Sequence, residues 1–141
     1  MNQQIRSLLR GRKLKKLLRE QYSPIRKKYG ITQLDIELLQ YFDEHPGSAA
    51  SDVIRELQLN KGNVSTALLH LFQEGYVDGE SRVKDRRVVE YKLKPKGRKV
   101  IRETEVIRRQ LLDTLFEGLN DKEWEVLGVV AEKVINNLEQ L

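Results

Sequence analysis

Apolar side chains recur at spacings of three and four residues along most of the chain, a pattern typical of amphipathic helices. The first such stretch covers residues 2–22, where Gly11 is a local weak point. The pattern predicts six further helices, over residues 24–29, 33–44, 52–57, 61–74, 95–116 and 121–138. The connections between them are short, so a second independent domain is not expected.

Helix boundaries are marked by residues that cap or break helices. Pro24 ends the first helix and leaves Ser23 as the predicted cap of a short continuation that stops at Gly30. Thr32 with Asp35, and Asn120 with Glu123, match the capping-box pattern. Further starts and stops are predicted at Ser51, Asn60, Gly75 and Pro95.

Two stretches rich in β-branched and aromatic residues interrupt the helices. Residues 76–77 and 88–93 are predicted strands, joined by a polar, basic loop that is long for a tight hairpin. Two short helices followed by such a hairpin predict a winged helix-turn-helix over residues 31–97. The fold class is therefore mainly α with a small β-wing.

The helices over residues 1–30 and 98–141 flank a segment that would be complete without them. Their long apolar stripes predict dimerisation helices contributed by both ends of two chains, within a single domain spanning residues 1–141. A monomeric helical bundle is the alternative.

The second helix of the pair is predicted to read DNA. Val53, Ile54, Leu57, Leu59, Val64, Leu68 and Leu71 are the expected shared core of the pair. Short polar residues suit base edges in the major groove, and a helix N-terminus favours phosphate. The residues left on the open face, with Ser51 from the preceding helix, are Asn60, Lys61, Gly62, Asn63, Ser65, Thr66 and His70.

Several of these residues have a simpler interpretation. Asn60 can serve only as a helix cap, and His70 can be an ordinary solvated side chain. Lys61 favours a phosphate over a base. Gly62 permits close backbone approach or is a neutral surface position.

Positive charge is concentrated in two blocks of a chain with net charge +5. Residues 1–30 hold ten Lys or Arg against Glu20, a local charge of +9, and residues 82–102 hold ten against Asp85 and Glu90, a local charge of +8. A basic hairpin tip can contact phosphates or the minor groove. The candidate residues there are Arg82, Lys84, Asp85, Arg86 and Arg87. Two solvated faces are the plainer explanation.

Other functions find little support in the composition. The chain has no cysteine, which excludes disulfides and thiolate chemistry. It has no apolar run approaching the roughly 18 residues of a membrane span and no secretory signal, so a cytoplasmic protein is expected. No nucleophile or phosphate-loop motif indicates an enzyme, and two histidines 25 positions apart indicate no metal site or cofactor.

The segments LQLNKGNVSTALLHLFQEGYV and KDRRVVEYKLKPKGRKV resemble the MarR family of winged-helix transcriptional regulators. The matching positions are Leu57, Leu59 to Val64, Asp85-Arg86-Arg87 and Lys94-Pro95-Lys96-Gly97. The resemblance covers nearly the whole chain. It departs at Thr66, where the family often has Arg, and at His70, so a target sequence cannot be transferred.

The resemblance implies an obligate homodimer on double-stranded DNA, with repression as the usual outcome. It implies that Arg87 enters the minor groove and that Asp85 orients it. It also implies a small-molecule effector between the dimer helices and the DNA-binding lobe. The aromatic candidates, which equally suit a core, are Tyr22, Tyr29, Tyr41 and His45.

Two other binding functions remain open. The basic blocks also suit a non-specific nucleic-acid-binding module, although the aromatic platforms of RNA-binding domains are missing. The basic helix over residues 2–22 also suits a membrane surface or a protein partner.

Overall fold

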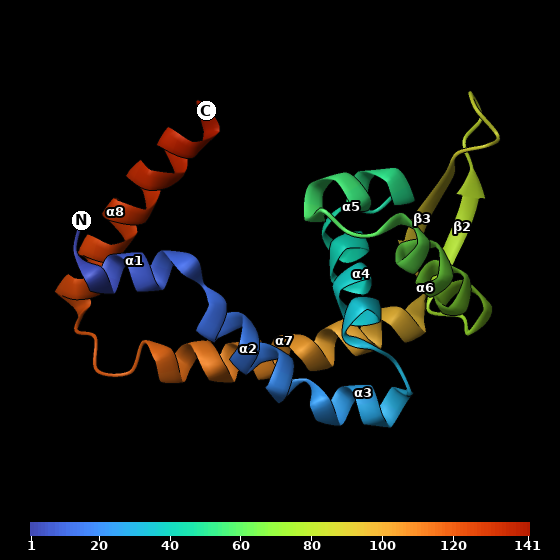
Figure 1. Cartoon of the computed structure of the whole chain (residues 1–141). Helices are drawn as coiled ribbons and strands as arrows, with labels where there is room; N and C mark the ends of the chain where they lie inside the picture. Colours follow the sequence, from blue (N-terminus) through green and yellow to red (C-terminus); the bar gives the residue numbers. More distant parts are fainter. The chain divides into compact units, whose positions relative to one another are not determined.

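A computed structural model describes all residues 1–141 (Figure 1). The helices are α1 (Gln3–Arg10), α2 (Arg12–Gln21), α3 (Ser23–Tyr29), α4 (Gln33–Glu44), α5 (Ala50–Leu57), α6 (Lys61–Gln73), α7 (Pro95–Leu115) and α8 (Asp121–Glu139). The strands are β1 (Ser48–Ala49), β2 (Val77–Ser81) and β3 (Val89–Leu93). The chain divides into two compact units, Met1–Arg108 and Arg109–Leu141. No helix combines the length and the apolar character needed to cross a bilayer.

Helix α4 lies at the centre of the first unit and packs against α6 and β3. Ile36, Leu38, Leu39 and Phe42 of α4 are fully buried. Val53 of α5, Val64, Leu68 and Leu71 of α6, and Val100 of α7 complete this core as buried side chains. Burying one such side chain contributes about 1.5–3 kcal/mol, so the helix pair is held on α4 by its apolar face.

The helix pair matches the predicted core with one correction. Ile54 and Leu59 pack partly buried against the core, but Leu57 is 45% exposed and does not belong to it. Leu57 is the last residue of α5, and Gln58 follows in the left-handed conformation with φ 53°. This tight turn redirects the chain and leaves the Leu57 side chain outside the core.

The sheet is antiparallel with strand order β1-β3-β2. The register pairs Val77 with Leu93 and Ser81 with Val89, so β2 extends well beyond the predicted residues 76–77. Strand β1 pairs Ser48 with Tyr91 and was not predicted. A strand of two residues is too short to show an alternating pattern in the sequence, so its pairing with β3 can be recognised only in the folded structure.

The predicted helix starts are confirmed at Thr32, Asn60 and Asn120. Thr32 and Asp35 form a reciprocal capping box, as do Asn120 and Glu123. The Asn60 Oδ1 accepts a hydrogen bond from the Asn63 amide at 3.0 Å.

Two predicted serine caps are wrong. Helix α5 begins one residue before Ser51, and the Asp52 carboxylate accepts the hydrogen bond of the Ala49 amide at 2.8 Å instead. Ser23 is already helical, with Tyr22 at the cap position and no side-chain cap. Helix α5 starts earlier because Asp52 satisfies the Ala49 amide, whereas Ser23 is helical because Tyr22 before it already has the right-handed helical conformation, with φ −80° and ψ −4°.

The predicted single helix over residues 2–22 is two helices. Gly11 adopts φ 59° and ends α1, donating its amide hydrogen bond to Leu8 O at 3.1 Å. A left-handed glycine is a common helix stop, which the apolar spacing alone did not reveal.

The second unit consists of the end of α7, a short turn and α8. The ring centroids of Phe116 and Trp124 lie 5.0 Å apart across the turn, with the ring planes tilted by 44°. Helix α8 buries none of its residues within the chain. Its exposed apolar side chains are Trp124, Val126, Leu127, Val129, Val130, Val134, Ile135 and Leu138.

Candidate nucleic-acid interface

The turn between α5 and α6 aims the N-terminal end of α6 at solvent. The Leu59 amide donates to Ile54 O at 3.1 Å, which closes the turn around the left-handed Gln58. The Asn60 side chain then caps α6. The predicted reading residues are all exposed, namely Asn60, Lys61, Gly62, Asn63, Ser65, Thr66 and His70.

These residues do not form one surface but occupy two flanks of α6. Asn63, Thr66 and His70 recur at spacings of three and four and line an open depression beside the segment 30–35. Ser65 lines a different groove, between α6 and the strands β2 and β3. Asn60 has the simpler role of cap, and its Oδ1 is also the nearest atom to a Cβ built on Gly62, at 3.3 Å.

The tip of the hairpin carries an ordered acid–base pair. The Asp85 carboxylate accepts hydrogen bonds from the Arg87 amide at 3.1 Å, Nε at 3.2 Å and Nη2 at 3.4 Å. The side-chain hydrogen bond from Arg87, followed by the backbone one, lowers the pKa of Asp85 below its usual range. The Arg87 side chain is nevertheless 91% exposed, so its guanidinium contacts Asp85 while remaining open to a ligand.

Several cations of the second basic block are used inside the fold. Arg82 Nε donates to Glu90 Oε1 at 2.5 Å across the base of the hairpin. Lys96 donates to Glu74 O at 3.0 Å and lies over the Tyr76 ring at 4.3 Å. Arg98 donates to Leu93 O at 2.8 Å. The charge count of the sequence therefore overstates the number of cations available to a polyanion.

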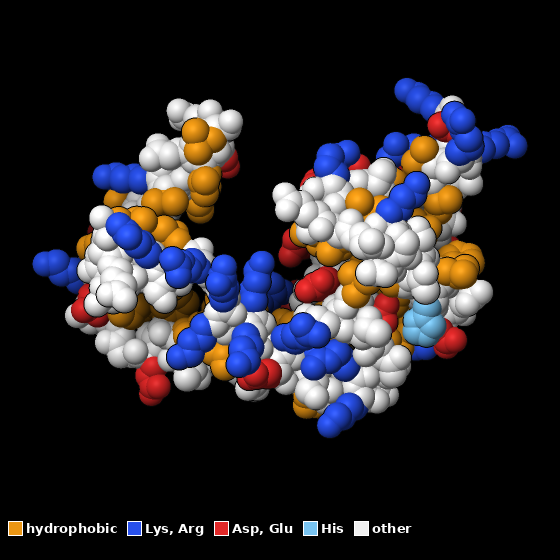
Figure 2. Space-filling view, viewed as in Figure 1, with side chains coloured by type: hydrophobic (Ala, Val, Ile, Leu, Met, Phe, Trp, Pro, Cys, Tyr) orange, Lys and Arg blue, Asp and Glu red, His pale blue; other side chains and the backbone are white.

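Lys84 and Arg86 are exposed beside Arg87. Figure 2 shows Lys and Arg side chains gathered at the far end of the hairpin, beyond the sheet. Ser51 is exposed in the first turn of α5. The arrangement offers hydrogen-bonding and cationic groups from a helix and from a hairpin tip.

The predicted effector residues do not converge. The ring of Tyr29 lies edge-on to that of Tyr76, with 6.5 Å between ring centroids. The rings of Tyr41 and His45, near the end of α4, have centroids 4.8 Å apart. Tyr22 is buried elsewhere, where its hydroxyl oxygen accepts a hydrogen bond from Gln40 Nε2 at 3.5 Å. The four side chains therefore have separate contacts, because they come from different segments of the chain: Tyr22 contacts Gln40, Tyr29 contacts Tyr76, and Tyr41 contacts His45.

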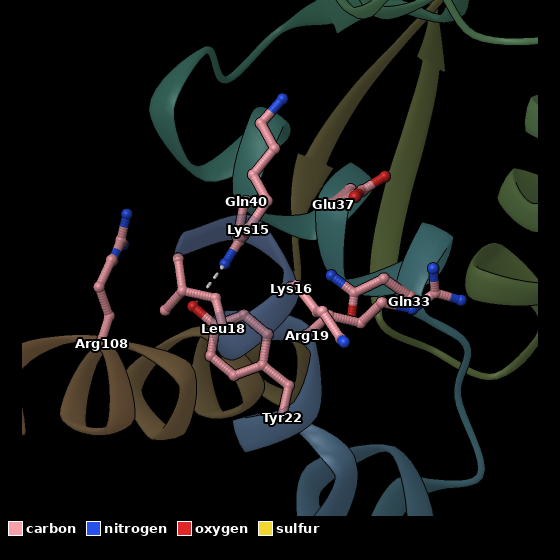
Figure 3. Close-up of a pocket in the computed structure, with 9 residues that line it drawn as sticks. All are labelled: Lys15, Lys16, Leu18, Arg19, Tyr22, Gln33, Glu37, Gln40 and Arg108. Carbon is pink, nitrogen blue, oxygen red and sulfur yellow. Dashed lines mark hydrogen bonds between the residues drawn. The ribbon is translucent and has the colours of Figure 1, made fainter. Parts of the chain in front are cut away.

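Tyr22 instead borders an open pocket of about 450 Å³ between α2, α4 and α7 (Figure 3). Its cationic lining consists of Lys15, Lys16, Arg19 and Arg108, with Glu37 as the single acid. Sequence reasoning missed this pocket, because its residues come from three helices distant in sequence. The clustering of cations in residues 12–19 was the available signal.

The histidines lie apart, and no three potential metal-ligating side chains gather anywhere in the chain. His45 packs against Tyr41 and His70 lies on α6.

A short helix pair whose second helix is exposed, followed by a basic hairpin, defines a winged helix-turn-helix protein. Residues 31–97 match the family profile described as a winged helix DNA-binding domain. An uncharacterized HTH-type transcriptional regulator of Bacillus subtilis (strain 168), YwhA, is 31% identical over 96 residues, which cover 67% of this chain and 69% of that protein.

Solved structures show the same fold. A MarR transcriptional regulator from Methanosarcina mazei Go1 superposes with a TM-score of 0.72 at 23% identity, covering 93% of this chain and 95% of that one. Wild-type MarR from E. coli superposes with a TM-score of 0.76 at 21% identity, covering 95% and 96%. Streptococcus pneumoniae FabT, solved in complex with DNA, superposes with a TM-score of 0.72 at 24% identity, covering 98% and 97%.

The chain belongs to the MarR family of winged-helix transcriptional regulators. It is a DNA-binding regulator of transcription, and its relatives are regulators rather than enzymes.

Proposed function

We propose that this protein is a repressor that binds a pseudo-palindromic operator as a homodimer. Helix α6 enters the major groove, and Arg87 enters the adjacent minor groove. The observation that carries this proposal is the ordered Asp85–Arg87 pair at the exposed hairpin tip. A guanidinium held in one orientation loses less conformational freedom on binding than a free side chain.

The predicted DNA contacts divide by chemistry. Asn63, Thr66 and His70 on one flank of α6, and Ser65 on the other, face base edges. Lys61, Lys84, Arg86 and the first turn of α5 with Ser51 face phosphates. Arg82 stabilises the hairpin through its ion pair with Glu90, and its attraction to DNA phosphates is a secondary role.

Selection from a random duplex pool, followed by footprinting, tests this proposal. Two inverted half-sites about 10 base pairs apart are expected, one helical turn, because a two-fold dimer presents one α6 per half-site. A single asymmetric half-site would contradict the dimeric operator. Repression is tested with a reporter placed behind the selected operator, since expression should rise when the protein is removed.

The support for a homodimer is the apolar face of α8, which has no partner within the chain. Val126, Leu127 and Val130 are exposed within the chain and line an apolar depression in the second unit. Exposed apolar patches larger than a few hundred Å² mark interaction sites in soluble proteins. Val130→Asp should convert the dimer to a monomer in light scattering, whereas Glu125→Gln on the same helix should not.

A small-molecule effector is proposed to bind the pocket beside Tyr22. Lys15, Lys16, Arg19 and Arg108 give the pocket a strongly positive lining, so the expected ligand is an organic anion. Its volume lies within the usual range of ligand sites, about 300–1,000 Å³. A panel of aromatic and aliphatic carboxylates should shift the melting temperature of the wild type more than that of Arg108→Ala. Equal shifts in both proteins would contradict this location.

A further inference from the structure

Helix α6 exposes two large apolar side chains on the flank that carries Ser65. Leu69 is 58% exposed and Phe72 is 48% exposed. They follow Ser65 at spacings of four and seven residues, so the three side chains form one stripe along the helix. The polar DNA contacts proposed for α6 do not explain why this helix exposes large apolar side chains.

This stripe faces an open groove between α6 and the hairpin. Leu68, Leu69 and Phe72 line one side, and Gly79, Val89 and Tyr91 line the other. No charged side chain lines the groove. Figure 2 shows hydrophobic side chains exposed beside α6, below the cationic end of the hairpin.

Gly79 keeps the strand side of this groove open. A Cβ at this position would lie 3.0 Å from Val89 Cγ1 and 3.3 Å from Tyr91 Cε1. A side chain on Gly79 would therefore crowd the two residues that line the groove. The absence of a side chain preserves an apolar surface next to α6.

The position of the groove indicates its occupant. It is continuous with both parts of the DNA interface, since Ser65 belongs to its lining and the strands that border it lead to Arg87. The major groove of DNA presents one apolar group, the C5-methyl of thymine. A protein partner would need no basic hairpin alongside, whereas duplex DNA contacts both elements together.

We propose that Leu69 contacts a thymine methyl group in each half-site and thereby selects an A·T pair at that position. The proposal rests on α6 lying in the major groove, as described above. Ser65 and Leu69 then act together on one flank, reading hydrogen bonds and a methyl group. Asn63, Thr66 and His70 read other base edges from the opposite flank.

Deoxyuridine substitution tests this contact directly, because it removes only the methyl group and leaves base pairing intact. Fluorescence anisotropy would be measured with the operator obtained by selection, replacing thymines one at a time. The wild type should lose about fourfold in affinity at one thymine per half-site, the scale of burying one methyl or methylene group. Leu69→Ala should bind the unmodified operator more weakly and show no further loss at that thymine.

Three controls accompany the test. Leu69→Ala should keep the salt dependence of the wild type, because Leu69 contacts no phosphate. It should also keep the melting temperature, since the side chain is more than half exposed. Leu57→Ala, at the exposed end of α5 and outside the groove, should leave the response to deoxyuridine unchanged.

Wild-type affinity that is unaffected at every thymine would overturn the proposal. An equal loss in the wild type and in Leu69→Ala would also overturn it, and would leave the groove to a protein partner. These outcomes differ from failure of the operator model, which would appear earlier as a selection that yields no motif.

Discussion

Arg87 donates hydrogen bonds from its backbone amide and from its guanidinium to the carboxylate of Asp85, two residues earlier in the chain. The backbone hydrogen bond shapes the tip of the hairpin, and the side-chain hydrogen bonds direct the guanidinium. Asp85 thus places a negative charge close to a proposed DNA contact, which would weaken binding unless it served to orient Arg87.

Asp85→Asn should lower specificity rather than overall affinity for DNA. The neutral amide orients Arg87 less well, while the loss of a carboxylate reduces repulsion of phosphates. The ratio of operator affinity to shuffled-duplex affinity should therefore fall, with shuffled-duplex affinity equal or higher. Anisotropy with both duplexes at fixed salt measures this ratio.

The same pair can be tested by a double-mutant cycle. If Asp85 acts only through Arg87, combining Asp85→Asn with Arg87→Ala should add no further loss of specificity to that of Arg87→Ala. Additive losses would show that Asp85 acts independently of Arg87.

Substitutions at Asn60 can distinguish its role as a helix cap from a contact with DNA. Asn60→Ala should lower stability by about 1 kcal/mol, because the Asn63 amide loses its acceptor. Asn60→Asp keeps an acceptor and should keep the stability, yet it should weaken DNA binding through its negative charge. Denaturant unfolding and anisotropy measured on both variants would separate the effects. Equal DNA affinity in Asn60→Asp would place residue 60 outside the interface.

Gly97 marks a close approach between α7 and Tyr76, the residue that directly precedes β2. A Cβ at Gly97 would lie 2.4 Å from the carbonyl oxygen of Tyr76, which already accepts the Lys94 amide at 2.9 Å. Gly97→Ala should therefore destabilise the protein by about 1–3 kcal/mol through overpacking. Gly128, a helical glycine with no atom near a built Cβ, is the matched control. Gly128→Ala should be neutral or stabilising by up to about 1 kcal/mol.

Glu103 links α7 to α3 through Lys28, whose Nζ lies 2.6 Å from Glu103 Oε1. This hydrogen bond lowers the pKa of Glu103 and raises the pKa of Lys28. A lowered carboxyl pKa contributes stability above the unfolded value of about 4.3, and that contribution is lost as the pH falls through the folded value. A raised lysine pKa contributes stability below about 10.4, and that contribution is lost as the pH rises further.

Glu103→Gln should therefore be less stable than the wild type at pH 7, and the difference should shrink at pH values below about 4. Urea unfolding at both pH values measures it. Glu20→Gln, which removes an exposed ion pair with Lys16 at 4.0 Å, is the control and should have no measurable effect. If the difference in stability between Glu103→Gln and the wild type were the same at both pH values, the packing of the residue 103 side chain rather than its charge would account for it.

Much of the fold was predictable because local signals coincide with the tertiary structure. Thr32, Asn60 and Asn120 start helices in sequence and in structure, and the apolar spacing of α4 to α6 matches the buried core. The failures lie where the deciding contact is distant or conformational. The left-handed Gly11 divides the first helix, and β1 exists only because Tyr91 lies opposite Ser48.

The interface was predictable in its residue types but not in its geometry. Polar positions on α6 are visible in the sequence, whereas their division between two flanks depends on the neighbouring segment 30–35 and on the strands. The hydrogen bonds from Arg82 to the Glu90 carboxylate and from Lys96 to the Glu74 carbonyl oxygen likewise form only in the folded chain. The assignment of each α6 residue to a base or a phosphate stays a prediction, as does the cytoplasmic location.

The most direct test of the central claim compares wild type and Arg87→Ala on the selected operator and on a shuffled duplex, across a salt series. The wild type should prefer the operator by about a thousandfold or more. Arg87→Ala should lose most of that preference while remaining a folded dimer in circular dichroism and light scattering. Unchanged operator preference in Arg87→Ala would contradict the proposed role of the hairpin tip in DNA recognition.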